Sequence, residues 1–329
     1  MAAVKKQTLV LDGRTLAISN FDKVLWPEDG LTKGDLITYY RTVAQWLLPH
    51  LEDRPLTLQR YPNGIHDQSF FEKQAPRGVP DWIKTVAVPS YGEKRTNIDY
   101  LVCNDEATLV YCANLASIVL HVWTSRIHSL DNPDYMLFDL DPWDGCTLKT
   151  IATVALAFRD LFAEIGLQAL VKTSGSTGLH VVVPLKPDYD YEPVKQFAEI
   201  AARRIAALHP KATTLERMTA RRAPGTVYLD YVQVGRGKTL VPPFVVRARE
   251  AAPVSMPLDW SEVDEFARKR TKEPTLQFAR WTIKNAPARL RRDGDLWGAK
   301  CWREQRLEPA LKKARKIWET QGHAPATEP

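Results

Sequence analysis

The sequence predicts an α/β fold with a mixed sheet. Segments with strand character alternate with segments whose apolar residues recur every three or four positions, and this alternation covers most of the chain. No internal repeat or low-complexity linker interrupts it. Of the 329 residues, 44% are hydrophobic and 26% are charged, which is ordinary for a globular protein and excludes a disordered or fibrous chain.

The first half of the chain predicts one amphipathic helix, one short strand and one buried helix. Apolar residues recur at helical spacing from Thr32, which is a suitable N-cap, and Pro49 is expected to end that helix. Residues 55–60 have strand character and run into a turn at 61–64. The stretch 106–123 is apolar over most of its surface, which predicts a buried helix.

The second half predicts a regular succession of strands and helices. The expected elements are a strand at 135–142, a helix at 148–165 ended by Gly166, β-rich segments at 167–173 and 179–185, a helix at 194–208 and a strand at 226–233. From about residue 259 the chain becomes helical and charged.

Charge and cysteine content narrow the class of protein. The 45 Lys and Arg residues against 39 Asp and Glu residues give a net charge of +6, a weak indication of anionic partners. No apolar run reaches the roughly 20 residues of a membrane-spanning helix, and the first residues lack the apolar core of a signal peptide. The four cysteines are far apart without a C-x-x-C pair, so we expect reduced thiols in a cytoplasmic protein.

Two acidic segments are candidates for a metal site. On a strand, Asp139 and Asp141 face one side while Phe138 and Leu140 face the other, and close carboxylates repel unless a cation lies between them. Asp230 lies in a second apolar segment, where burying a lone carboxylate is costly. Shared metal ions would explain all three acids. The alternatives are a strand end with solvated carboxylates and a salt bridge from Asp230 to Arg221 or Arg222.

The segment Thr173–His180 contains small and hydroxyl residues between two strands. Such a turn exposes backbone N–H groups that can bind phosphate oxygens, and its serine, threonine and histidine side chains add donors. The alternative is an ordinary glycine-rich hairpin. The segment lacks the Walker lysine and the G-x-G-x-x-G spacing, which excludes a P-loop or Rossmann site.

Two further segments combine cations with aromatic residues. Lys238, Arg247 and Arg249 follow the Asp230 segment and suit a triphosphate, although such charges also occur on solvated faces. Adjacent aromatic and basic residues in the N-terminal part suit stacking on bases and contacts to phosphates. These residues are Lys23, Lys33, Arg60, Phe70 and Phe71. We expect one of the two phenylalanines to belong to the core.

Taken in order, these motifs resemble one family. DLDP (139–142), SGSTGLH (174–180) and LDYVQ (229–233) are similar to the three catalytic motifs of archaeo-eukaryotic primase-polymerases. The segments SNFDKVLWP, LTKGDLITYY, RYPNG, FFEKQAP, PPFVVRAR, APVSMPL and GDLW resemble the polymerase domain of bacterial ATP-dependent DNA ligase D. The resemblance predicts a primase-polymerase domain at residues 1–300 and a C-terminal helix with a frayed tail at 301–329.

The resemblance implies a fold with an RRM-like catalytic sheet packed against a second α/β layer. It implies a template-directed nucleotidyltransferase in DNA repair that prefers ribonucleotides and uses two ions, Mn²⁺ or Mg²⁺. Its implied partners are nucleoside triphosphates, gapped or broken DNA with a 5′-phosphate, Ku and an ATP-dependent DNA ligase, and its implied location is the nucleoid.

The resemblance also implies a role for individual residues. The catalytic and metal-binding residues are Asp139, Asp141 and Asp230. The nucleotide-binding residues are Ser174, Thr177, Gly178, His180, Gln233, Lys238 and Arg247. The DNA-binding residues are Lys23, Lys33, Arg60, Phe70, Phe71 and His121, of which Lys23 and Lys33 match residues that hold a downstream 5′-phosphate.

Two departures from the family pattern affect nucleotide affinity rather than the reaction class. Many relatives have lysine where this chain has Thr177, and some have lysine at Gln59. Two alternatives to a polymerase stay open at this point: a non-catalytic module that binds gapped or 5′-phosphorylated DNA ends, and a metal-dependent phosphoesterase. End joining and short-gap excision repair are both open as the pathway.

Overall fold

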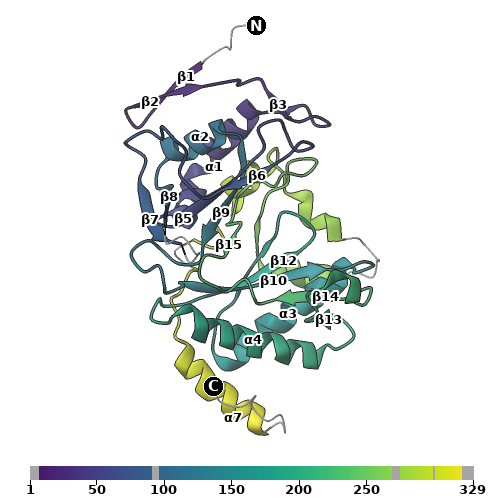
Figure 1. Ribbon diagram of the computed structural model, residues 1–329. Coiled ribbons are helices and arrows are strands. Elements are labelled where there is room, and N and C mark those ends of the chain that lie inside the picture. The colour runs from purple at the N-terminus through teal and green to yellow at the C-terminus, as the bar shows by residue number, and fades with distance from the viewer. Residues whose placement is uncertain (1–6, 91–95, 269–274, 299–300, 321–329) are drawn as a thin grey trace. The chain divides into compact units, whose positions relative to one another are not determined.

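The computed structural model describes residues 7–90, 96–268, 275–298 and 301–320, which divide into two compact units (Figure 1). Unit 1 contains residues 1–128, 239–256 and 279–295. Unit 2 contains residues 129–238, 257–278 and 296–329. Each unit has its own hydrophobic core and contains both helices and a sheet. The mixed α/β class predicted from the sequence is therefore confirmed.

Unit 1 is built on a sheet in the strand order β15-β9-β5-β8-β7, with β6 paired to β5. The strands of this sheet are β5 (Pro55–Arg60), β6 (Phe70–Glu72), β7 (Thr85–Pro89), β8 (Asn97–Val102), β9 (Ser117–Trp123) and β15 (Thr239–Leu240). Two hairpins precede it, β1 (Gln7–Leu11) with β2 (Arg14–Ile18) and β3 (Val24–Trp26) with β4 (Leu31–Thr32). Its helices are α1 (Lys33–Leu51), α2 (Glu106–Asn114) and α6 (Ala286–Asp293).

Helix α1 begins where the sequence predicts and ends later. The Thr32 side chain accepts a hydrogen bond from the Asp35 N–H, and the Asp35 carboxylate accepts one from the Thr32 N–H, which completes a capping box. Pro49 was expected to end this helix but lies inside its last turn. The helix continues to Leu51, whose side chain is fully buried, so core packing outweighs the hydrogen bond that proline cannot donate.

The single helix expected at 106–123 is wrong. The segment forms α2, a turn with Ala116 at a φ of 57°, and then strand β9. β9 lies between β5 and β15 and nearly all of its residues are buried, so its sequence is apolar except for Ser117 and His121. A fully buried strand cannot be distinguished from a buried helix by periodicity alone.

Unit 2 is built on a sheet in the strand order β13-β14-β10-β12-β11-β16. The strands are β10 (Tyr135–Pro142), β11 (Leu170–Thr173), β12 (Leu179–Pro184), β13 (Thr213–Thr214), β14 (Val227–Asp230) and β16 (Pro257–Leu258). The helices are α3 (Leu148–Ile165), α4 (Tyr191–Leu208), α5 (Trp260–Arg268) and α7 (Leu307–Thr320), with 3₁₀ turns η1 (Thr219–Arg221) and η2 (Thr275–Arg280).

Several boundaries in unit 2 agree with the sequence. Strand β10 and helix α3 have the predicted limits, and Gly166 ends α3 with a φ of 86°. Helix α4 starts three residues earlier than predicted, because Pro193 is tolerated in a first turn. Strand β14 is shorter than the predicted 226–233.

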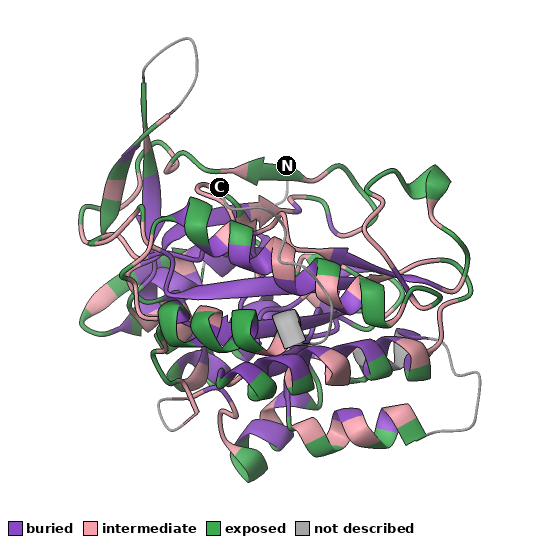
Figure 2. Cartoon of the chain, turned by 90° about the horizontal axis from the view of Figure 1, so that it is seen from below, coloured by how far each residue is buried: buried purple, intermediate pink, exposed green. Residues whose placement is uncertain are grey.

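One face of the unit 2 sheet is apolar and packs on helices; the other, here called the polar face, carries the acidic residues among apolar ones such as Leu137 and Val182. Alternate residues of β10, including Phe138 and Leu140, pack into a core with α3 and α4, and Phe138 contacts Phe158 and Phe162 of α3. Figure 2 shows these strands in the colour of buried residues, while the outer sides of the helices are exposed. The residues that alternate with this core set point to the other face, where the acidic residues of the sequence motifs lie.

The C-terminal helix α7 packs onto the unit 2 core through Leu307, Ala310 and Ala314. The expected frayed tail falls at 321–329, outside the described residues, and a domain boundary at residue 300 stays a prediction. Among the helices described, none combines the length and apolar character needed to cross a bilayer.

Candidate active site

The polar face of the unit 2 sheet brings the three predicted carboxylates together. Asp139, in the central strand β10, is directly opposite Asp230 of β14, and Asp141 follows two residues later on the same strand. Directly opposed residues on neighbouring strands project to the same face, about 5 Å apart. Asp141 and Asp230 are 89 positions apart in the sequence (230 − 141), yet both belong to one acidic surface.

Asp230 differs from the expectation that it lies inside a buried strand. It is the last residue of β14 and is only half-buried. Its carboxylate accepts hydrogen bonds from the Val232 N–H at 3.0 Å and from the Gln233 side-chain amide at 2.9 Å. These donors reduce the cost of burying the charge, and they place Gln233 beside the acidic surface.

Arg222, one of the two arginines considered as a salt-bridge partner of Asp230, makes other contacts. The Arg222 guanidinium lies over the Tyr228 ring, 3.9 Å from its centroid, and donates a hydrogen bond to the Glu216 carbonyl. Arg221, the other candidate, lies exposed in η1.

Two buried basic residues lie beside the acidic surface, on the next two strands of the sheet. His180 of β12 is opposite Asp139, and its Nε2 atom lies 3.3 Å from the Asp139 Oδ1 atom. Lys172 of β11 is in turn opposite His180 and is 1% exposed. Its ammonium donates a long hydrogen bond of 3.5 Å to the Thr173 carbonyl. The sequence analysis missed Lys172, although the short turn between β11 and β12 predicts that it faces the same side as His180.

The donor set of this face fits hard divalent cations. Carboxylate oxygens are the ligands that Mg²⁺ and Mn²⁺ prefer, and three of them on one face repel each other when no cation is present. Within the part of the chain that the structure describes, no three His, Cys, Asp or Glu side chains close into a ready metal cluster. The Asp230 oxygens, for example, are turned toward Val232 and Gln233. This face therefore carries the right kind of ligands for a divalent cation, but its carboxylates do not yet converge on one point.

The predicted phosphate loop is a hairpin that connects β11 to β12. The Ser174 Oγ atom accepts hydrogen bonds from the N–H groups of Ser176 and Gly178, at 3.2 and 3.1 Å. These two amides are therefore engaged inside the loop. A Cβ atom on Gly178 would lie 2.6 Å from the carbonyl oxygen of Leu140, so glycine lets the loop lie against β10 between Asp139 and Asp141.

In unit 1, both phenylalanines of β6 are exposed, which contradicts the expectation that one belongs to the core. Phe70 is 42% and Phe71 is 59% exposed. The Arg60 guanidinium lies over the Phe70 ring at 5.3 Å, and the Phe71 ring meets the edge of His121 at 5.3 Å. Exposed rings backed by a cation are suited to stacking on nucleic-acid bases.

His121 is an uncharged hydrogen-bonding group beside these rings. Burial, together with the positive charge of Arg247, lowers its pKa to about 3. Its Nε2 atom lies 3.3 Å from the Gln59 side-chain oxygen, which can only accept, so the Nε2–H donates. His121 therefore stays neutral across the physiological range.

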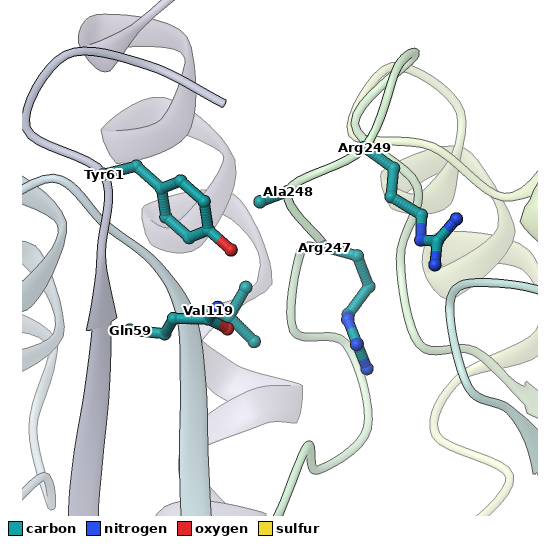
Figure 3. A pocket seen from close by; sticks show the side chains of 6 residues that line it. All are labelled: Gln59, Tyr61, Val119, Arg247, Ala248 and Arg249. Carbon is teal, nitrogen blue, oxygen red and sulfur yellow. The ribbon is translucent and has the colours of Figure 1, made fainter. Parts of the chain in front are cut away.

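A pocket of about 370 Å³ in unit 1 adjoins the same strands. Gln59, Tyr61, Val119, Arg247, Ala248 and Arg249 line it. Figure 3 shows the Tyr61 hydroxyl and the Arg247 guanidinium on opposite sides of the opening. Burial raises the pKa of Tyr61, while the two arginines and a hydrogen bond with Ser69 act against that rise. Two guanidinium groups beside a neutral phenol suit an anionic ligand. The sequence analysis did not identify Tyr61.

The two lysines expected at a 5′-phosphate lie close together. The backbone N–H of Lys33 donates to the Lys23 carbonyl at 2.8 Å. The Lys33 side chain is 4% exposed, and its ammonium donates to Ser19 and to the carbonyl and side-chain oxygens of Asn114. Burial, followed by the charge of Lys23, lowers the pKa of Lys33 to about 8. Lys23 itself donates to the Asn63 side chain at 3.0 Å.

Lys238, the remaining predicted cation, is exposed after a tight turn in which its N–H donates to the Gly235 carbonyl at 3.0 Å. The described structure therefore forms three groups of predicted site residues. The acidic face with His180 and Gln233 is in unit 2, and the aromatic patch with its neighbouring pocket and the lysine pair are in unit 1.

Comparison with known structures identifies the class. The structure matches the polymerase domain of Mycobacterium tuberculosis ligase D, solved in complex with DNA, with a TM-score of 0.77 and 31% identity over 86% of this chain and 96% of that one. The chain therefore has the fold of a ligase D polymerase domain, in the class of primase-polymerases.

Sequence comparison identifies the family. Residues 32–297 match the model for the primase-polymerase domain of LigD, and the chain belongs to this family. It is 33% identical over 248 residues to the multifunctional non-homologous end joining protein LigD of Mycolicibacterium smegmatis, which covers 75% of this chain and 32% of that protein. It is 30% identical over 280 residues to the bifunctional LigD of Bacillus subtilis, covering 85% and 43%. The chain spans well under half the length of these relatives.

Proposed function

We propose that this chain is a template-directed nucleotidyltransferase that adds nucleotides to DNA ends or short gaps. One observation carries the proposal: the register of β10 and β14 sets Asp139 opposite Asp230, with Asp141 on the same face. Three carboxylates that face a polyanionic substrate would repel it unless divalent cations lie between them, so a module that only binds DNA has no use for them.

Asp139, Asp141 and Asp230 would hold two Mn²⁺ or Mg²⁺ ions. When bound, such ions stabilise the charge that develops in phosphoryl transfer and lower the pKa of the attacking hydroxyl. Gln233 orients Asp230 through its hydrogen bond, and the His180 Nε2 atom lies beside Asp139, 3.3 Å from its Oδ1 atom. Gln233 therefore positions part of the acidic face before a substrate arrives.

The nucleotide and the DNA would contact the remaining groups. Ser174, Thr177, Gly178 and His180 border the acidic face and would meet the triphosphate, with Lys238 and Arg247 as further phosphate contacts. Thr177 would contribute a hydroxyl donor to this loop. Phe70, Phe71, Arg60 and His121 would line the template and the incoming base. Lys23 and Lys33 would hold a downstream 5′-phosphate.

The biological setting follows from the relatives. They are non-homologous end joining proteins, and the solved polymerase domain binds DNA. We therefore propose broken or gapped DNA and nucleoside triphosphates as substrates, with ribonucleotides and Mn²⁺ preferred. Ku and an ATP-dependent DNA ligase are the proposed protein partners, at the nucleoid.

Primer extension tests the proposal. With a primer-template, Mn²⁺ and nucleoside triphosphates, the chain should lengthen the primer, whereas Asp139→Ala and Asp141→Ala should each reduce extension by about a hundred- to a thousandfold, as for other charge-stabilising groups. DNA binding should persist in both variants. Asp144→Ala removes an exposed carboxylate just beyond β10 and should leave extension unchanged. Binding without extension by the unaltered chain would instead support the DNA-end binding module, and shortening of the primer a phosphoesterase.

A further inference from the structure

Helix α7 presents an exposed cationic surface that the proposed active site does not use. Lys312, Lys313 and Arg315 are exposed, whereas Leu307, Ala310 and Ala314 face the unit 2 core. The helix packs against α3, which covers the apolar face of the unit 2 sheet. The cationic surface therefore lies on the helix-covered side of the unit, opposite the face that carries Asp139. It also follows the segment 32–297 that matches the family model.

Charge is concentrated in this segment. Residues 303–320, which are helix α7 and the residues that lead into it, contain six Lys and Arg residues and three Glu residues, which gives 6 − 3 = +3 against a net charge of +6 for the whole chain. A charge equal to half of the net charge of the protein is therefore concentrated in this short segment. Such a local excess produces a positive potential that attracts polyanions.

The cations of α7 differ from those on α4, one of the long helices of unit 2. On α4, Lys195 pairs with Glu192, and Arg203 pairs with Glu199 at 2.7 Å. On α7, no ion pair of Lys312, Lys313 or Arg315 occurs within the described residues, and the preceding Arg306 shares Asp188 with Lys186. A solvated helix face usually mixes both signs of charge, as α4 does. Lys312, Lys313 and Arg315 lack such pairing among the side chains that the structure describes.

We propose that this face of α7 is a second DNA-contact surface, which binds the phosphate backbone of duplex DNA outside the reacting terminus. Residues 312–316 make a little more than one helical turn, about 6 Å along the axis. Duplex DNA carries one negative charge per about 1.7 Å, so one turn can contact several phosphates. Lysine and arginine side chains suit contacts to the phosphate backbone, which carry no sequence information. The surface would hold DNA by charge while the acidic face acts on its end.

Salt-dependent binding to a blunt, unphosphorylated duplex without a gap tests this surface in the full chain. The variant Lys312→Ala/Lys313→Ala/Arg315→Ala should bind at least about tenfold more weakly at low salt, with a slope of log affinity against log salt reduced by up to about three. The control, Lys211→Ala/Lys284→Ala/Arg291→Ala, removes the same charge from exposed positions elsewhere and should keep the full slope. Thermal unfolding checks that both variants fold.

Equal loss of binding in the two triple variants would overturn the proposal, because only net charge would then matter. Unchanged binding in the α7 variant would overturn it as well. Because the assay needs no nucleotide, metal or extension, its result is independent of the polymerase proposal. If that proposal holds, the α7 variant should also extend a primer at the normal maximal rate when DNA is saturating.

Discussion

Lys33 has a pKa close to neutral pH. Three hydrogen-bond acceptors surround its ammonium, but burial and the charge of a second lysine nearby lower its pKa to about 8. An arriving phosphate dianion would favour the protonated form of Lys33. A lysine pair of this kind can therefore distinguish a 5′-phosphate from a 5′-hydroxyl only while Lys33 carries its proton.

We predict that the preference for a 5′-phosphate declines as pH rises from 7 to 9. Lys33 loses its proton over this range, whereas the phosphate, with a second pKa near 6, stays fully ionised. The ratio of affinities for gapped DNA with a 5′-phosphate and with a 5′-hydroxyl should fall by up to about tenfold. Fluorescence anisotropy at constant ionic strength measures the ratio.

Lys33→Arg provides the control, since an arginine stays charged throughout and should keep its preference at pH 9. A ratio independent of pH in the unaltered chain would contradict the role of Lys33. The lowered pKa of Lys33 also makes the stability of the fold depend on pH. The unfolded chain keeps this proton up to about pH 10.5, whereas the folded chain releases it near pH 8. The free energy of unfolding should therefore increase as the pH rises from about 8 to about 10.5.

At the scale of elements, the hairpin between β11 and β12 is held against the strand that carries both aspartates of the D-x-D motif. Ser174 closes the loop on itself, and Gly178 brings it into contact with the Leu140 carbonyl. The carbonyl belongs to the backbone between Asp139 and Asp141, so neither partner can yield without disturbing the acidic face.

We predict that Gly178→Ala separates this loop from β10. The added Cβ atom would lie 2.6 Å from the Leu140 oxygen. The variant should be less stable by about 1–3 kcal/mol, as in other overpacked sites. Its KM for nucleoside triphosphates should rise at least about tenfold, because a displacement of about 1 Å is costly in a preorganised site.

Gly166→Ala is the control. Nothing lies within 4 Å of its added Cβ atom, but its φ of 86° strains an alanine, so it should lower the stability and leave the KM unchanged. Steady-state extension kinetics and thermal unfolding of both variants separate the cases. If Gly178→Ala, like Gly166→Ala, left the KM unchanged, the close approach of loop and strand would have no functional role.

Some helices and strands could be predicted from the sequence alone, and others could not. The start of α1 and the end of α3 could be predicted because each is decided locally, by the Thr32 cap and by Gly166. Strand β9 could not, because a strand buried on both faces has lost its polar alternation. Asp139 and Asp141 were predictable as neighbours from the two-residue period of one strand. The pairing of Asp139 with Asp230 is long-range, and only the order of strands in the sheet decides it.

At the scale of the whole molecule, the acidic face is a place where function opposes stability. Three carboxylates on one sheet face repel each other in the metal-free protein, and the Asp230 hydrogen bonds offset only part of that cost. Ions that bind the folded chain and not the unfolded chain should therefore raise its thermal stability.

We predict that Mn²⁺ raises the midpoint of thermal unfolding and that chelation reverses the rise. At a concentration of about 100 times the dissociation constant, the gain is about 2.7 kcal/mol. The double variant Asp139→Asn/Asp230→Asn should lose this response. Because it removes two of the repelling charges, it should also unfold at a higher temperature than the metal-free unaltered chain. An equal response of both proteins to Mn²⁺ would place the ions elsewhere, and a less stable metal-free variant would mean that the carboxylates support the fold. The second outcome is the more informative, since a structural acid and a metal-binding acid differ in the sign of the stability change when the charge is removed.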